Sequence, residues 1–81
     1  MSWRVFLTNS AQPDVDALTD ADRAALTEDL FAWVEPGPPR SGRRIVAGAE
    51  LFEHRLPSGI VLTYFVNEEV PYVAVVRARK R

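Results

Sequence analysis

The C-terminal part of the chain contains three apolar stretches separated by two short turn sequences, and this pattern constrains the fold more than any other. The stretches cover residues 50–56, 60–66 and 70–79. Pro57-Ser58-Gly59 supplies a proline for the first turn position and a glycine that tolerates positive φ, and Asn67-Glu68-Glu69 is a short polar turn. Both turn sequences are typical of β-hairpins. The three stretches therefore predict an antiparallel meander of three strands.

Side chains alternate between the two faces of a β-strand, so each strand residue is assigned to a face. In the second stretch one face carries Ile60, Leu62, Tyr64 and Val66, and the other carries Val61, Thr63 and Phe65. In the third, strict alternation places Val73, Val75, Arg77 and Arg79 opposite Tyr72, Ala74, Val76 and Ala78. Both tyrosines fall on apolar faces, which favours core positions, although a tyrosine exposed beside the arginines can instead stack on a base.

The N-terminal part begins with a short strand and a short helix. Residues 3–8 are rich in β-branched and aromatic residues and end at Asn9-Ser10, which predicts a strand. Residues 11–18 contain Pro13, which a helix tolerates only in its first turn. At most two helical turns are therefore expected there.

A longer helix is predicted over residues 20–34. Thr19 followed by Asp22 resembles a capping box, which marks a helix start, and Pro36 marks the end. The apolar residues of this segment fall at i, i+4, i+7 and i+8, on one face of an amphipathic helix: Leu26, Leu30, Trp33 and Val34. We expect this face to pack on the sheet. The large aromatic residues of the N-terminal half are interpreted as core residues rather than base-stacking platforms: Trp3, Phe31 and Trp33.

The order strand, helix, helix, antiparallel meander predicts an α+β domain of two layers. The first strand can pair with the last, and residues 45–47 either add a short strand or lead into the meander. At 81 residues the chain is expected to form a single domain over residues 1–81, which buries roughly 60–65% of its unfolded surface.

Composition excludes several classes of site. Cysteine is absent, which removes disulfides, thiolate zinc sites and cysteine nucleophiles, and His54 is the only imidazole. No glycine-rich phosphate loop, metal cluster or Ser/His/Asp set is present, so we predict no metal and no cofactor. The longest apolar run near the start, Val5-Phe6-Leu7, is too short for a signal peptide or a membrane span. A reducing cytoplasm fits best, with no membrane partner.

The near-neutral total charge hides two poles of opposite sign. Residues 1–35 carry two cations and seven carboxylates, a balance of −5, whereas residues 36–81 carry eight cations and four carboxylates, a balance of +4. The basic pole ends in a strand that runs into a cationic tail at residues 77–81. A polyphosphate partner is predicted there, although such charges also serve to keep an edge strand from aggregating.

The succession of elements is similar to a known family. A strand opened by Trp3, two helices, a Pro/Gly break and a meander carrying residues 48–55 (GAELFEHR) and 62–66 (LTYFV) together resemble the RelE/ParE toxin superfamily over nearly the whole chain. The resemblance implies a RelE/ParE-like domain from a bacterial toxin–antitoxin system. Many members of this superfamily are ribosome-dependent endoribonucleases of messenger RNA, the ParE branch instead poisons DNA gyrase, and an antitoxin commonly wraps the toxin.

An endoribonuclease would need a base for the ribose 2′-hydroxyl, cations for the scissile phosphate and an acid for the leaving oxygen, and would form a 2′,3′-cyclic phosphate. Glu53 or His54 is the candidate for proton transfer. Glu53 is favoured because it shares a strand face with Arg55, whereas His54 points to the other face. The predicted catalytic set is Glu53, Arg55, Arg77 and Arg79. The predicted RNA-binding residues are Arg43, Arg44, Lys80 and Arg81.

A non-catalytic module is the alternative. Ribonuclease members usually carry an arginine in the strand before the central tyrosine, and residues 59–63 contain none. The same sheet would then bind gyrase or hold a partner peptide instead of cutting RNA.

Overall fold

In the described part of the chain, two helices precede the longest strands of a five-stranded mixed β-sheet. The computed structural model describes residues 2–40, 42–46 and 49–80. Its elements are β1 (Arg4–Leu7), α1 (Gln12–Asp16), α2 (Asp20–Phe31), β2 (Arg43–Val46), β3 (Ala49–Arg55), β4 (Ile60–Asn67) and β5 (Tyr72–Lys80). The predicted α+β order of strand, helical pair and antiparallel meander is confirmed, and residues 43–46 add the short strand.

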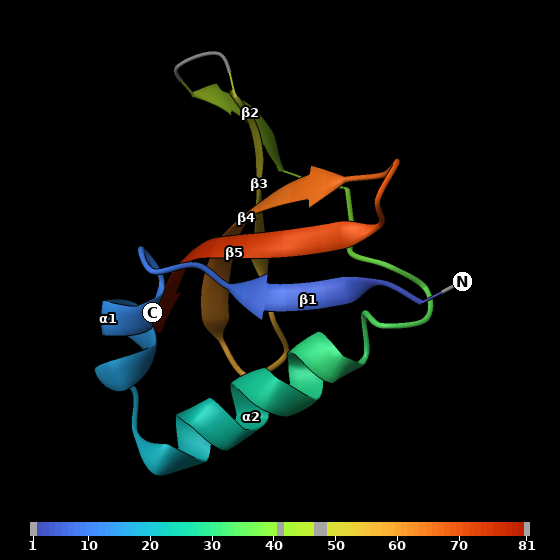
Figure 1. Cartoon of the computed structure of the whole chain (residues 1–81). Coiled ribbons are helices and arrows are strands. Elements are labelled where there is room, and N and C mark those ends of the chain that lie inside the picture. The colour runs from blue at the N-terminus through green and yellow to red at the C-terminus, as the bar shows by residue number, and fades with distance from the viewer. Residues whose placement is uncertain (1, 41, 47–48, 81) are drawn as a thin grey trace.

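The strands lie in the order β1-β5-β4-β3-β2. β1 runs parallel to β5, with Val5 opposite Val73, and all other neighbours are antiparallel. The expected pairing of the first strand with the last is therefore confirmed. The sheet twists strongly, so that β2 and β3 run almost crosswise to β1 and β5 (Figure 1). Gly59 takes a φ of 89° in the turn between β3 and β4, as that hairpin requires.

Helix α2 lies on one side of the sheet, and α1 stands beside the C-terminal end of β5 (Figure 1). Helix α2 begins as predicted, because the Asp22 amide donates a hydrogen bond of 3.1 Å to Thr19 Oγ1. It ends at Phe31, three residues earlier than predicted. The amides of Trp33 and Val34 donate to carbonyls three residues back, at Leu30 and Phe31, so the last turn tightens before Pro36.

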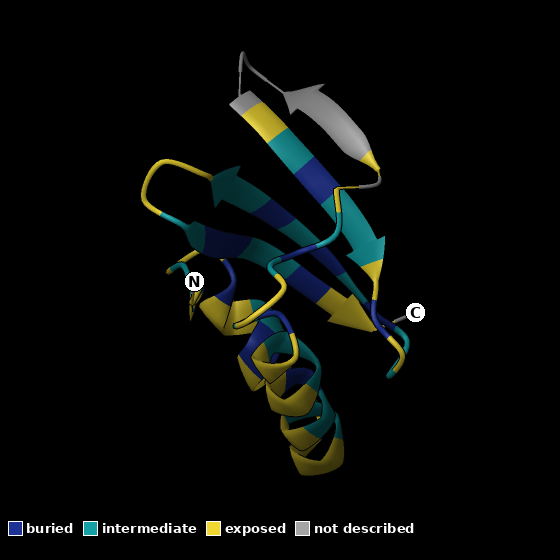
Figure 2. Cartoon of the chain, turned by 90° about the vertical axis from the view of Figure 1, so that its right-hand side faces the viewer, coloured by how far each residue is buried: buried dark blue, intermediate teal, exposed yellow. Residues whose placement is uncertain are grey.

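The core lies between the sheet and α2, on what we call the inner face of the sheet. Five strand residues are fully buried there: Ile60, Leu62, Tyr64, Val73 and Val75. Figure 2 shows buried residues alternating with less buried ones along these strands. Trp33 closes the core, with its ring centroid 5.1 Å from that of Tyr64. Among the described residues, no charged side chain is buried.

The predicted apolar stripe of the long helix packs against this core at Leu26, Leu30 and Trp33. Phe31 does not, because it follows Leu30 by one position and is rotated away from the stripe. It is 75% exposed, so its interpretation as a core residue is wrong. No helix in the described part of the chain is long and apolar enough to cross a membrane.

Candidate functional site

The face of the sheet opposite the core, which we call the outer face, carries two rows of side chains across β3, β4 and β5. Directly opposed residues have Cβ atoms about 5 Å apart, so each row forms one continuous surface. From β3 to β5 the rows consist of Glu53, Thr63 and Arg77, and of Arg55, Val61 and Arg79.

These rows surround a pocket of about 150 Å³ lined by Glu53, Val61, Thr63, Arg77 and Arg79, which we call the arginine pocket. Three of the four predicted catalytic residues therefore line the same pocket. The fourth, Arg55, is exposed and lies opposite Val61 at the β3 side, outside the lining. The pocket combines one carboxylate with two guanidinium groups, a set that can bind a phosphate and accept a proton beside it.

A β-bulge in β5 decides which side chains of that strand reach the outer face. Thr63 lies opposite Arg77, but the next residue, Tyr64, lies opposite Val75, so Val76 has no partner in β4. The extra residue reverses the alternation. Val75 is fully buried in the core, whereas Arg77 lines the outer pocket. The strict alternation predicted for this strand, which placed both on one face, is therefore wrong at Val76.

Arg77 is held at the pocket rim by Asp14 of α1. Arg77 Nε donates to Asp14 Oδ2 at 2.8 Å and Nη2 donates to Oδ1 at 3.4 Å, and the Ala78 amide donates to Oδ2 at 3.0 Å. The hydrogen bond from the Arg77 side chain lowers the pKa of Asp14, and the same contact raises the pKa of Arg77. Asp14 thus fixes the Arg77 side chain, and it also accepts a hydrogen bond from the edge of β5 at a point beyond the end of β1.

Lys80, predicted to contact RNA, is directed elsewhere. Its Nζ lies 2.8 Å from Asp22 Oδ1, in the first turn of α2. This hydrogen bond lowers the pKa of Asp22. Lys80 does not line the arginine pocket. The basic and acidic poles of the sequence therefore meet in the folded chain, since Arg77 and Lys80 both pair with aspartates of the helical layer.

The remaining predicted RNA contacts are only partly described. Arg43 and Arg44 belong to β2, opposite Phe52 and Leu51 of β3, and their side chains lie outside the described part of the structure. Arg81 lies outside the described residues altogether.

The two candidates for proton transfer are separated by the sheet. His54 lies on the inner face, where its ring centroid is 6.2 Å from that of Trp33. Glu53 lines the pocket. Its backbone is fixed by Gly42, whose carbonyl accepts a 3.1 Å hydrogen bond from the Glu53 amide. Gly42 has a φ of 73°, and a side chain there would collide with the Glu53 carbonyl.

Sequence reasoning missed three residues of this site, Val61, Thr63 and Asp14. Thr63 contributes the centre of one row, and its place opposite Glu53 follows from strand pairing once the hairpin register is known. Asp14 has no local signal, because its partner Arg77 is 63 residues away in sequence. Among the described residues, no group of His, Cys, Asp and Glu side chains is arranged to hold a metal ion.

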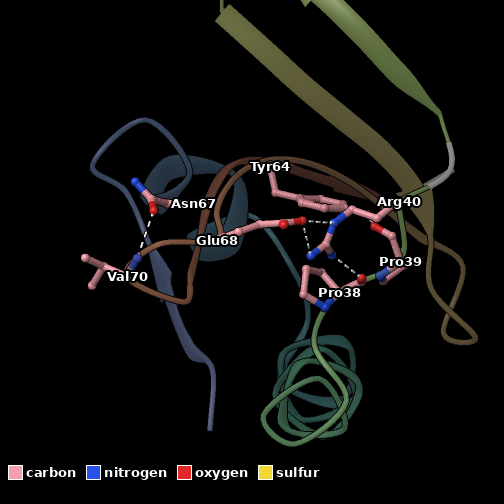
Figure 3. Close-up of polar contacts among 7 residues, drawn as sticks. All are labelled: Pro38, Pro39, Arg40, Tyr64, Asn67, Glu68 and Val70. Carbon is pink, nitrogen blue, oxygen red and sulfur yellow. Dashed lines mark hydrogen bonds and ion pairs between the residues drawn. The ribbon is translucent and has the colours of Figure 1, made fainter. Parts of the chain in front are cut away.

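A second polar cluster fixes the proline-rich segment before β2 to the sheet (Figure 3). Arg40 forms a 2.9 Å ion pair with Glu68, donates to the Pro38 carbonyl and lies 5.1 Å from the Trp3 ring centroid. The Tyr64 hydroxyl donates to the Pro39 carbonyl at 2.7 Å, and burial raises the pKa of Tyr64 to about 12. Arg40 is therefore engaged in holding this segment.

An apolar groove of about 270 Å³ lies between β1 and α2. The residues that line it include Val5, Phe6, Leu30, Val34 and the exposed Phe31. β1 is also an edge strand of the sheet, since it pairs only with β5 in the described part of the chain.

No protein-family model and no curated protein sequence matches the chain. Solved structures do. A chain of the toxin–antitoxin complex RelBE2 from Mycobacterium tuberculosis matches with a TM-score of 0.80 and 23% identity over 100% of both chains. A free mutant of the E. coli toxin RelE matches with a TM-score of 0.75 and 20% identity, covering 99% of this chain and 84% of that one.

An archaeal RelE–RelB complex from Pyrococcus horikoshii is also similar, with a lower TM-score and a lower identity. It matches with a TM-score of 0.70 and 17% identity, covering 100% of this chain and 97% of that one. At these identities the likeness rests on structure, and it extends over the whole arrangement of strand, helical pair and meander. The chain therefore has the RelE toxin fold, as the sequence resemblance predicts.

Proposed function

We propose that the chain is the toxin of a toxin–antitoxin system and that it cuts messenger RNA on the ribosome, in the cytoplasm. The observation that carries this proposal is the convergence of Glu53, Arg77 and Arg79 on one pocket of the outer face, which neither helix covers. The likeness of the fold to RelE toxins supports the same reading. The reaction proposed is transfer of an RNA phosphate from the 5′-oxygen to the neighbouring 2′-oxygen.

Glu53 is the proposed general base. Of the residues that line the pocket, it alone carries a carboxylate that can accept a proton, because the others are valine, threonine and two arginines. It accepts the proton of the 2′-hydroxyl as the oxygen bonds to phosphorus. The bond from phosphorus to the 5′-oxygen breaks, a 2′,3′-cyclic phosphate remains, and the leaving 5′-oxygen takes a proton from water.

The arginines stabilise the charge that builds on the phosphate. Arg79 is exposed at the pocket and can approach a phosphate oxygen directly, with Arg55 two strands away in the same row. Arg77 uses Nε and Nη2 on Asp14, which leaves Nη1 for the substrate. A fixed guanidinium needs no reorganisation when charge develops, and this is how preorganised donors lower a barrier.

The test is induced expression in a bacterial host, with growth and messenger RNA cleavage sites followed by primer extension. We expect growth arrest and cleavage from the intact chain, and loss of both with Glu53→Gln and Arg79→Ala. Glu28→Gln is the matched control, because Glu28 is an exposed carboxylate on α2, away from the pocket. Absence of cleavage by the intact chain, or full cleavage by Glu53→Gln, contradicts the proposed activity.

We propose an antitoxin as the protein partner, bound at the groove between β1 and α2. An edge strand next to an apolar groove suits an extended peptide that adds to the sheet and inserts a side chain beside Phe31. Co-expression with the neighbouring reading frame should yield a complex that Phe31→Lys weakens and Glu53→Gln does not. A complex equally stable with Phe31→Lys would place the partner elsewhere.

One observation favours a second function, that of a non-catalytic binding module. Val61 occupies the pocket between Arg55 and Arg79, and it belongs to the strand segment before Tyr64 that lacks the arginine usual in ribonuclease members of the superfamily. Purified chain that captures gyrase or another protein while leaving RNA intact would support this reading. RNA cleavage without any protein partner would reject it.

A further inference from the structure

Three aromatic side chains form a row on the outer face, beyond the arginine pocket. Phe6 of β1, Tyr72 of β5 and Phe65 of β4 come from three adjacent strands. The ring centroids of Phe6 and Tyr72 are 5.5 Å apart, and those of Tyr72 and Phe65 are 6.1 Å apart. The rings are inclined to one another by only 32° and 35°. Together they cover part of the outer face, and we call them the aromatic row.

The aromatic row does not belong to the core. The core lies on the inner face, and both described helices stand on that side or at the β5 edge (Figure 1). Phe6 is 43% exposed, and Tyr72 and Phe65 are partly exposed. Single apolar residues are common on protein surfaces, but a group of three neighbouring rings that are open to solvent indicates a binding site.

Arginines stand at both ends of the aromatic row. At one end, Phe65 follows Thr63 of the arginine pocket by two residues on the same strand face, which is about 7 Å along a strand. At the other end, Arg4 lies opposite Tyr72 and is exposed. A recess of about 550 Å³ opens there between Arg4, Phe6 and Tyr72. Along the outer face, the aromatic row therefore lies between the arginine pocket at one end and Arg4 at the other.

This alternation matches the chemistry of a single-stranded nucleic acid, in which charged phosphates alternate with flat bases. Proteins bind such strands with aromatic side chains on which bases stack and with cations along the backbone. An apolar peptide would suit the rings but not the arginines on either side. We propose that the aromatic row stacks the base next to the phosphate held in the arginine pocket, with Arg4 contacting a phosphate further along the strand.

The inference rests on the proposed function for its substrate, but its test does not depend on cleavage. Binding is measured by fluorescence anisotropy with a labelled oligodeoxyuridine of about eight nucleotides, which lacks the 2′-hydroxyl and is not cut. The second probe is the same backbone without bases. Tyr72→Leu and Phe65→Leu keep the apolar surface and remove the π-face.

We expect each leucine variant to bind the base-bearing probe about 5- to 100-fold more weakly than the parent chain. Affinity for the abasic probe should stay unchanged. Glu28→Gln, at an exposed residue of α2 that lines neither the arginine pocket nor the aromatic row, is the control and should change neither affinity. Thermal unfolding of each variant verifies that the fold is intact.

Three results would overturn the proposal: equal weakening of both probes, no change with either variant, or a parent chain that binds the abasic probe as tightly as the base-bearing one. Loss of antitoxin capture by Tyr72→Leu with RNA affinity retained would assign the row to a protein partner and also overturn it. Stacking without messenger RNA cleavage would leave the inference standing and reject the proposed reaction.

Discussion

The two faces of one sheet differ in almost every property, although the same strands build both. On the inner face, Ile60, Leu62 and Tyr64 of β4 are fully buried. On the outer face, Val61 and Thr63 of the same strand stand between charged residues of β3 and β5. Stability therefore resides mainly on one face, and the other is free to bind. Substitutions on the inner face should therefore mainly lower stability, and substitutions on the outer face should mainly lower binding.

The largest effect on stability is expected from the inner face. Leu62→Ala removes a fully buried side chain and leaves a cavity, so the free energy of unfolding should fall by about 2–5 kcal/mol. Chemical denaturation followed by circular dichroism measures the change. Val61→Ala is the matched control, one residue away on the outer face, and should cost less than about 1 kcal/mol. Similar losses for both variants would contradict the division between the faces.

The second-largest effect on stability is expected at the contact between Asp14 of α1 and Arg77 of the outer face. The Asp14 side chain is only 16% exposed and accepts hydrogen bonds from Arg77 and the Ala78 amide. Asp14→Asn should lower the free energy of unfolding at pH 7 by about 1–2 kcal/mol, because hydrogen bonds to a charged group are lost. Asp16→Asn, an exposed aspartate of the same helix, is the control and should change it by less than about 0.5 kcal/mol.

The pH dependence of that effect has a definite sign. The folded pKa of Asp14 is lowered by its hydrogen bond to Arg77. Its stabilising contribution is therefore complete above the unfolded value of about 3.9 and is lost as pH falls through the lower folded value. The difference in unfolding free energy between parent and Asp14→Asn should shrink as pH falls below about 4. A difference that stays constant down to pH 2 would show that the charge of Asp14 is not responsible.

Local sequence signals account for most of the fold but only part of the site. The turn at Gly59 and the cap at Thr19 act over a few residues, so hairpin and helix start follow from sequence. The end of α2 and the bulge at Val76 depend on tertiary packing, and both differ from the prediction. Glu53 and Arg79 reach one pocket because alternation fixes their face. The pairing of Arg77 with Asp14 joins distant parts of the chain and has no local pattern.

A smaller effect is expected at the point where the inner face holds the proline-rich segment. Tyr64→Phe removes the hydroxyl that donates to the Pro39 carbonyl and leaves that acceptor without its partner, which should cost about 1 kcal/mol. Tyr72→Phe is the matched control on the outer face, with an expected change below about 0.5 kcal/mol. Equal values for the two tyrosines, measured by denaturant unfolding, would mean that the Pro39 hydrogen bond contributes little.

The smallest effect on stability and the clearest effect on binding should come from one arginine of the outer face. Arg79 is exposed at the pocket, so Arg79→Ala should change the free energy of unfolding by less than about 0.5 kcal/mol. A cation that neutralises one phosphate releases one counterion from the nucleic acid. Arg79→Ala should therefore weaken binding to a single strand at low salt and reduce the slope of log affinity against log salt concentration by about 0.7.

Arg23→Ala, on α2, should leave that slope unchanged because Arg23 pairs with Asp20 away from the outer face. A slope that falls with Arg23→Ala but not with Arg79→Ala would move the nucleic acid to the helical layer. That result would reverse the roles assigned to the two faces, because the side that builds the core would then also bind the strand.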